Sequence, residues 1–170
     1  MKSTRLLNRN GQRTLVEWFK TNHRPLPWRV NRDPYRIWIS EVMLQQTTSR
    51  AVQPFFERFL KRFPNLKSLS QAKIEDVYEV WAGLGYYSRA RNLLKTAQIL
   101  GRTGFPKTFE ELLKLPGLGP YTARSISSLA FEQRVGVLDG NVIRVLSRLS
   151  GEAISWWTTE GRTKLQGWAD

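Results

Sequence analysis

A chain of 170 residues, 41% of them hydrophobic, can bury a core and favours one domain or two small subdomains over a disordered tail. Its net charge of +13 is spread along the chain, with +8 in the first 85 residues and +5 in the rest. A folded basic surface favours nucleic acid as the partner, although ribosomal and membrane-surface proteins share this charge balance. The chain has no cysteine and one histidine, His23. Disulfides, thiolate catalysis and cysteine-ligated zinc or iron-sulfur sites are therefore excluded, and we expect no metal site.

The sequence also indicates where in the cell the protein is expected. Its apolar runs are all shorter than the roughly 18 residues of a membrane span, and the Arg-containing segment 1–13 lacks the apolar centre of a signal peptide. We therefore expect a cytoplasmic, nucleoid-associated protein of a bacterium. The first 16 residues contain no acid, which leaves an organelle-targeting segment as the alternative.

Apolar residues recur at helical spacing along almost the whole chain, beginning with the stripe Leu15, Trp18 and Phe19. No segment alternates with period two, so the sequence predicts an all-α fold. We expect helices over residues 11–21, 36–47, 49–62, 73–82, 88–101, 108–114, 120–131, 140–150 and 158–168. Proline and glycine interrupt the pattern at 25–27, 63–65, 101–106 and 116–117, where helices should end.

The predicted helix 36–47 contains one acid in an apolar pattern. Glu41 shares a helix face with Ile37 and Leu44. Desolvation by apolar neighbours disfavours an ionised carboxyl, so Glu41 is a candidate general acid that holds a proton near neutral pH. The alternative is a boundary glutamate paired with a nearby arginine such as Arg36.

The segment 81–92 combines a glycine-flanked turn with two adjacent tyrosines, Tyr86 and Tyr87, and two arginines, Arg89 and Arg91. Neighbouring residues at a helix start point in different directions, so at least one tyrosine should face solvent or a ligand. Aromatic rings beside arginines suit base stacking next to phosphate contacts. The alternative is that both rings pack in the core. The turn is not a mononucleotide loop, because no predicted strand precedes it and no Gly-Lys-Ser or Gly-Lys-Thr follows.

A second glycine turn, Leu115-Pro116-Gly117-Leu118-Gly119-Pro120-Tyr121-Thr122-Ala123, joins the predicted helices 108–114 and 120–131. Glycine permits positive φ and close approach of the backbone to a ligand. The amides that open the following helix favour an anion. On so basic a chain, we expect that anion to be a DNA phosphate.

Asp139 lies in the segment Leu138-Asp139-Gly140-Asn141-Val142, immediately before the predicted helix 140–150. Its simplest role is an N-cap that accepts amide hydrogens of the first turn. A capping carboxylate at the edge of a cleft can also stabilise a cationic substrate. Asp-Gly is also found in hairpin turns, but the surrounding sequence has no strand pattern.

Five segments in order resemble adenine DNA glycosylases of the MutY type, which belong to the helix-hairpin-helix superfamily that includes endonuclease III. The resemblance covers roughly residues 12–150 and is carried by residues 26–29, 40–47, 83–93, 115–123 and 138–142. It implies the helix-hairpin-helix glycosylase fold: a six-helix barrel over residues 29–138 with its hairpin near 108–131. Residues 1–28 would supply the N-terminal helix of a second subdomain, and 139–170 the first of its returning C-terminal helices.

The resemblance implies base excision repair by a monofunctional glycosylase. The enzyme would flip adenine, mispaired with 8-oxoguanine or guanine, out of double-stranded DNA and hydrolyse its N-glycosidic bond. Glu41 would protonate adenine N7, and Asp139 would stabilise the oxocarbenium-like sugar. Tyr121 stands where bifunctional relatives carry a lysine that forms a Schiff base, and with Asn141 it would organise the intermediate near Asp139.

The same resemblance implies the DNA contacts. Gln46 would wedge into the base stack and Tyr86 would intercalate beside the lesion strand. Gly117, Leu118 and Gly119 form the expected phosphate-binding hairpin, and the arginines expected to contact DNA are Arg89 and Arg91.

Family members usually continue into further helices, a four-cysteine [4Fe-4S] module and a second domain that helps to recognise 8-oxoguanine. We therefore expect a truncated chain without a cofactor of its own. It should bind DNA as a monomer and be able to self-associate through the stripe at Leu15, Trp18 and Phe19. The alternatives are a thymine or uracil mismatch glycosylase of the same superfamily and a catalytically incomplete helix-hairpin-helix DNA-binding fragment.

Overall fold

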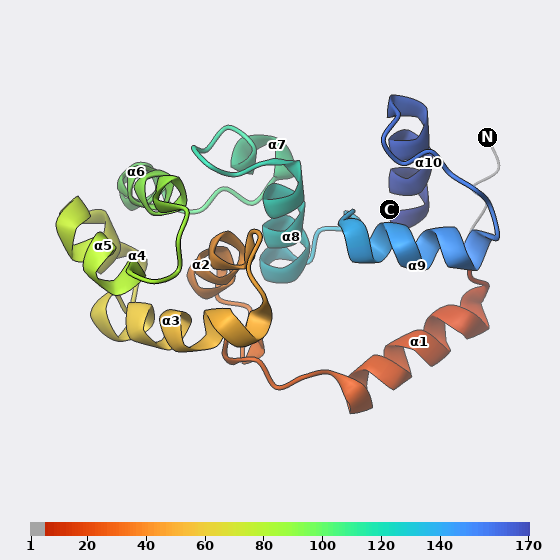
Figure 1. Ribbon diagram of the computed structural model, residues 1–170, viewed down its shortest axis with the longest axis horizontal. Coiled ribbons are helices and arrows are strands. Elements are labelled where there is room, and N and C mark those ends of the chain that lie inside the picture. The colour runs from red at the N-terminus through yellow and green to blue at the C-terminus, as the bar shows by residue number, and fades with distance from the viewer. Residues whose placement is uncertain (1–5) are drawn as a thin grey trace. The chain divides into compact units, whose positions relative to one another are not determined.

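The computed structural model describes residues 6–170, and its regular secondary structure over that range is entirely helical (Figure 1). The chain divides into two compact units: 26–133, and the described part of 1–25 together with 134–170. No helix in the described range is long and apolar enough to cross a membrane. The all-α prediction is confirmed.

The 26–133 unit begins with the 3₁₀ turn η1 (Pro27–Arg29) and contains seven α-helices. They are α2 (Pro34–Leu44), α3 (Ser49–Arg62), α4 (Leu66–Ser70), α5 (Ile74–Trp81), α6 (Tyr87–Thr103), α7 (Phe109–Leu112) and α8 (Pro120–Phe131).

Helix α2 is the central helix of this unit, in contact with α3, α6 and α8 (Figure 1). Asp33 caps it by accepting the Tyr35 amide at 2.9 Å, and Pro34 occupies its first turn, where a missing N–H costs nothing. Eight of its eleven residues are buried, so the helix is covered on all sides, as expected of a core helix. Glu41 therefore projects from the most enclosed element of the unit.

Aromatic side chains fill the core around α2. Trp28 packs edge-on against Phe56 with ring centres 5.3 Å apart, and Phe59 meets Trp81 in the same way at 6.1 Å. Such edge-to-face pairs stabilise a fold by about 0.5–1.5 kcal/mol beyond the area they bury.

The other unit contains α1 (Arg9–Asn22), α9 (Gly140–Ser150) and α10 (Thr159–Ala169). Helix α10 packs on α9 and buries Gly161 and Leu165. Gly136 lies against the end of α10, where an added Cβ would come within 2.2 Å of the Ala169 carbonyl group. Neither α1 nor α9 contains a buried residue.

All nine predicted helices are present, and the largest differences lie where tertiary contacts override local pattern. The helix predicted over 36–47 ends at Leu44, because Gln45 has a non-helical ψ of 114°, and Gln46 then takes a left-handed backbone with φ of 56°. The short helix α4 and the turn η1 were missed, since neither is long enough to show helical periodicity.

Candidate active site and nucleic-acid interface

The hairpin predicted near 108–131 is formed by α7, the turn 113–119 and α8. Gly117 has φ of +77°, and a Cβ there would lie 2.7 Å from the Asn92 Cβ, so both conformation and space require glycine. Gly119 has φ of −80° and nothing within 4 Å of a built Cβ, so its surroundings are open.

Helix α8 begins without a side-chain cap. Its N-cap is Gly119 and Pro120 follows, which leaves the amides of the next residues available to an anion. The Leu118 side chain is buried, so this residue can meet a ligand only through its backbone. The hairpin thus offers a small anion-binding surface made of main chain.

Two hydrogen bonds tie this hairpin to neighbouring helices. Thr96 of α6 donates its hydroxyl to the Pro116 carbonyl at 2.9 Å, and Gln45 donates its side-chain amide to the Thr122 hydroxyl at 3.2 Å. These positions were not singled out from the sequence. Both Thr96 and Thr122 are buried, which only the structure shows.

The predicted base-stacking segment forms the turn between α5 and α6. Gly83 and Gly85 have positive φ, and Tyr86, the residue before α6, has φ of 51°. Both tyrosines are exposed, Tyr86 by 58%. The expectation that at least one ring faces solvent is therefore confirmed.

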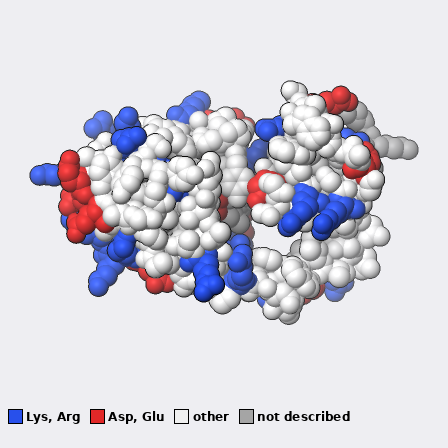
Figure 2. All heavy atoms as spheres, in the orientation of Figure 1, with Lys and Arg blue, Asp and Glu red and all other residues white. Residues whose placement is uncertain are grey.

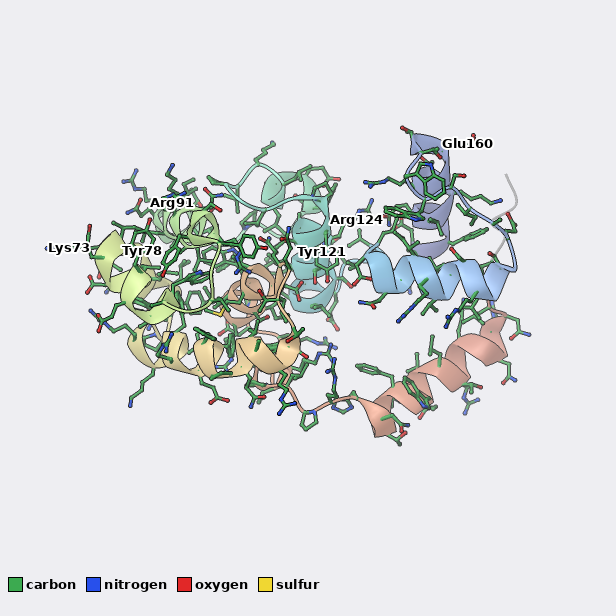
Figure 3. All side chains as sticks on the ribbon, viewed as in Figure 1. Lys73, Tyr78, Arg91, Tyr121, Arg124 and Glu160 are labelled. Atoms are coloured by element: carbon green, nitrogen blue, oxygen red, sulfur yellow. The ribbon has the colours of Figure 1, made fainter. Side chains whose placement is uncertain are left out.

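The neighbouring Tyr87 and Arg91 point toward α5. The Tyr87 ring meets the Tyr78 ring edge-on at 5.3 Å, and Arg91 donates to the Tyr78 hydroxyl at 3.4 Å. Figure 3 shows Tyr78 and Arg91 side by side at this end of the unit.

Glu41 of α2 is 7% exposed, whereas Gln46, in the turn that follows α2, is exposed. Tyr121 lies in the first turn of α8, partly exposed, with Arg124 one turn further along the helix (Figure 3).

Arg89 occupies a different setting from the DNA contact expected of it. Its side chain is buried and its guanidinium donates to main-chain carbonyls at the end of α2 and in the turn before α6. Burial lowers the pKa of Arg89 below its ordinary value, against a smaller opposing contribution from Tyr86.

A pocket of about 170 Å³ lies where α2, α6 and the hairpin meet. It is lined by residues of all three, among them Val42, Gln45, Arg89, Asn92 and Gly117. The structure thus brings the predicted hairpin, the end of α2 and the start of α6 together within one unit.

Asp139 and Asn141 belong to the other unit. Asp139 is the N-cap of α9, and its Oδ1 accepts the Val142 amide at 2.7 Å. Its Oδ2 accepts the Asn141 side-chain amide at 3.1 Å. The predicted capping role is confirmed, and the contact with Asn141 orients the carboxylate.

Both units are basic. The 26–133 unit carries 16 Lys and Arg against 9 Asp and Glu, and the remaining residues carry 11 against 5. Figure 2 shows Lys and Arg side chains on the visible face of each unit and not in a single arm. Within the described residues no group of three His, Cys, Asp or Glu side chains could hold a metal ion.

The chain is similar to known proteins in sequence and in fold. The sequence model of the family described as "HhH-GPD superfamily base excision DNA repair protein" matches residues 39–167. The protein named "Adenine DNA glycosylase" from Buchnera aphidicola of Schizaphis graminum is 42% identical over 158 residues, which is 91% of this chain and 45% of the relative. Its namesake from Buchnera aphidicola of Acyrthosiphon pisum is 45% identical over 141 residues, 81% of this chain and 40% of the relative.

The chain therefore spans less than half the length of these two relatives. Among solved structures, a non-covalent complex of endonuclease III with DNA superposes with a TM-score of 0.73 at 26% sequence identity. The superposition covers 95% of this chain and 76% of that one.

Proposed function

This chain belongs to the HhH-GPD superfamily of base excision DNA repair proteins, and from that membership we propose that it releases adenine from mispaired double-stranded DNA. The relatives named adenine DNA glycosylase support the choice of adenine. The observation that carries the proposal is the position of Glu41, a buried carboxyl on α2, the helix that leads into the turn with the exposed Gln46.

In the proposed reaction, duplex DNA is held by phosphate contacts at the hairpin 117–119 and the adenine is flipped out of the stack. Gln46 wedges into the base stack, and Tyr86 intercalates beside the lesion strand. Both are exposed, and both lie on turns that hydrogen bonds connect to the rest of the unit.

Glu41 then donates its proton to adenine N7. The N-glycosidic bond breaks, its electron pair leaves with adenine, and positive charge develops on the sugar. Asp139, oriented by Asn141, stabilises that charge. A water molecule adds to the sugar carbon and its proton returns to Glu41, so the products are adenine and an abasic site.

Tyr121 makes the proposed enzyme monofunctional. A phenol cannot form the imine by which a lysine amine attacks the sugar carbon. The strand should therefore remain intact after adenine release and break only on treatment with alkali.

The proposal is tested by single-turnover release of adenine from a duplex with adenine opposite 8-oxoguanine, with and without alkali. Duplexes with adenine opposite guanine and with thymine opposite guanine are run beside it. Faster release opposite 8-oxoguanine would support that preference. Release of thymine in place of adenine would identify a different mismatch glycosylase, and binding without release would identify a DNA-binding fragment.

The variant Glu41→Gln tests the role of Glu41 as the general acid. It should lower the single-turnover rate by at least about 10²-fold, because a placed general acid contributes 10²–10⁴ in rate. Duplex affinity should change little, since Glu41 is buried. Glu57→Gln, which changes an exposed glutamate on α3, serves as the control. Equal loss of binding and release in Glu41→Gln would contradict the catalytic assignment.

A further inference from the structure

Gln46 and Tyr86 share an uncommon backbone conformation. Their φ values are 56° and 51°, in the left-handed region that side chains other than glycine seldom adopt. For a residue with a Cβ this form is less stable than the right-handed one, so other contacts must hold it there. Of the described residues, Glu132 is the third non-glycine with positive φ, and it stands at the end of α8, where helices often finish in this way.

One side chain reaches both turns. Arg89 Nη1 donates to the carbonyls of Val42, Met43 and Gln45 at 3.2, 2.9 and 2.6 Å. Arg89 Nη2 donates to the carbonyls of Leu84 and Gly85, each at 3.2 Å. The guanidinium is thereby committed to five main-chain acceptors, and the residue is only 8% exposed.

Two of these acceptors immediately precede the left-handed residues. The Gln45 carbonyl belongs to the peptide group that joins Gln45 to Gln46, and the orientation of that group defines φ of Gln46. The Gly85 carbonyl has the same relation to Tyr86. By holding both carbonyls, Arg89 restricts φ at both residues.

The Tyr86 ring is held as well. The guanidinium carbon of Arg89 lies 5.1 Å from the centre of the Tyr86 ring and 5.6 Å from that of Trp81. Trp81 in turn donates its ring N–H to the Gly85 carbonyl at 3.0 Å. Cation–π attraction at these distances adds a direct contact between Arg89 and one of the two side chains.

We infer that Arg89 is a positioning residue that holds Gln46 and Tyr86 together in the conformation required to enter the DNA stack. The inference rests on the proposed function, which brings these two side chains to DNA. Arginine suits the task because its planar group carries five donors in a fixed arrangement. Lysine keeps the charge but cannot span acceptors in both turns.

The inference is tested with Arg89→Lys, and Arg102→Lys, an exposed arginine near the end of the same helix, is the matched control. The first readout is the strong intraresidue NMR contact between the amide hydrogen and Hα that positive φ produces. We expect this contact at Gln46 and Tyr86 in the unmodified chain and in Arg102→Lys, and its loss at both residues in Arg89→Lys. Its retention in Arg89→Lys would overturn the inference.

The second readout is the fluorescence of 2-aminopurine placed beside an adenine–8-oxoguanine mispair, which rises when neighbouring bases are unstacked. In Arg89→Lys this fluorescence increase should be about tenfold smaller, because two side chains must be ordered anew on binding. Affinity for a fully paired duplex should stay within about twofold, since the charge is kept. A direct phosphate contact predicts instead that both quantities stay close to those of the unmodified chain.

A third measurement needs no variant, in case Arg89→Lys does not fold. The Nη hydrogens of Arg89 in the unmodified chain should exchange slowly and give separate NMR signals that a paired duplex does not shift. Averaged signals, or signals that move on adding the duplex, would contradict the inference. All three readouts are independent of adenine release, so failure of the proposed catalysis is distinguishable from failure of the positioning role.

Discussion

Glu41 and Asp139 carry the same functional group in different surroundings. Glu41 is buried within α2, whereas Asp139 is half-buried and accepts two hydrogen bonds at the start of α9. The two carboxyls therefore differ in burial and in hydrogen bonding, and the proposed function assigns them different roles.

Asp139 combines two roles that substitution can separate. Asp139→Asn keeps an oxygen for the Val142 amide, and because Asn and Asp cap equally well, stability should stay within about 0.5 kcal/mol. Asp139→Ala removes the cap and should cost about 1 kcal/mol. Urea unfolding measures both values.

Adenine release should be lost in both Asp139 variants, because neither keeps the charge. If adenine release survives in Asp139→Asn but not in Asp139→Ala, Asp139 acts only as the N-cap of α9.

At the scale of elements, the hairpin shows two glycines with different roles. Gly117 is required by its own conformation and by the nearby Asn92, whereas Gly119 has ordinary φ and open surroundings. The first glycine shapes the turn, and the second leaves room above the start of α8.

Alanine substitutions distinguish these roles. Gly117→Ala should destabilise the chain by about 2 kcal/mol or more, because it combines a strained φ with a close contact. Gly119→Ala should leave the free energy of unfolding nearly unchanged and weaken duplex binding by crowding the phosphate. Thermal unfolding and duplex titration check the pair, and equal stability losses would show that the turn differs from the one described.

The start of α2 is joined to the end of α3 by a buried hydrogen bond. Tyr35 donates its hydroxyl to the Phe63 carbonyl at 2.8 Å. Burial, aided by the charge of Asp33, raises the pKa of Tyr35 well above its usual value. Neutral Tyr35 therefore contributes to the free energy of unfolding. This contribution is fully present below about pH 10, the usual tyrosine pKa, and is lost as the pH rises toward the pKa of Tyr35 in the folded chain.

Tyr35→Phe tests this pH dependence. At pH 8 the variant should be less stable than the unmodified chain by about 1 kcal/mol, the contribution of one hydrogen bond. Between pH 10 and 11 that difference should shrink by about 1 kcal/mol. A constant difference in urea unfolding across this range would contradict the assigned shift.

At the scale of the whole molecule, the two units differ in how much apolar surface they cover. The 26–133 unit contains nearly all of the buried core, while α1 exposes Leu15, Val16, Trp18 and Phe19 by about half or more. Contiguous exposed apolar surface of this kind promotes association.

We expect the chain to self-associate through α1. Sedimentation velocity should show a weight-average mass that rises with concentration, and Leu15→Gln with Trp18→Gln should restore a monomer. Arg13→Gln, which changes an exposed polar position on the same helix, should not restore it. A monomer at all concentrations would rule out this expectation.

The sequence by itself determined the helices, the hairpin and the cap. Apolar spacing, proline and glycine act within a few residues, so they were enough to predict nine of the helices. Asp139 was recognisable as the cap of α9 from its neighbours alone. The exposed tyrosine beside a glycine turn followed from the same local patterns.

Only the tertiary structure decided the contacts of Arg89 and the early end of α2. In sequence Arg89 belongs to a basic, aromatic stretch, and nothing local distinguishes it from Arg91. In the fold its guanidinium meets carbonyls more than 40 residues away, while Arg91 remains exposed. The burial of Arg89 and the left-handed backbone at Gln46 depend on such distant contacts. The free energy that maintains them comes from packing and hydrogen bonds that exist only when the helices are assembled.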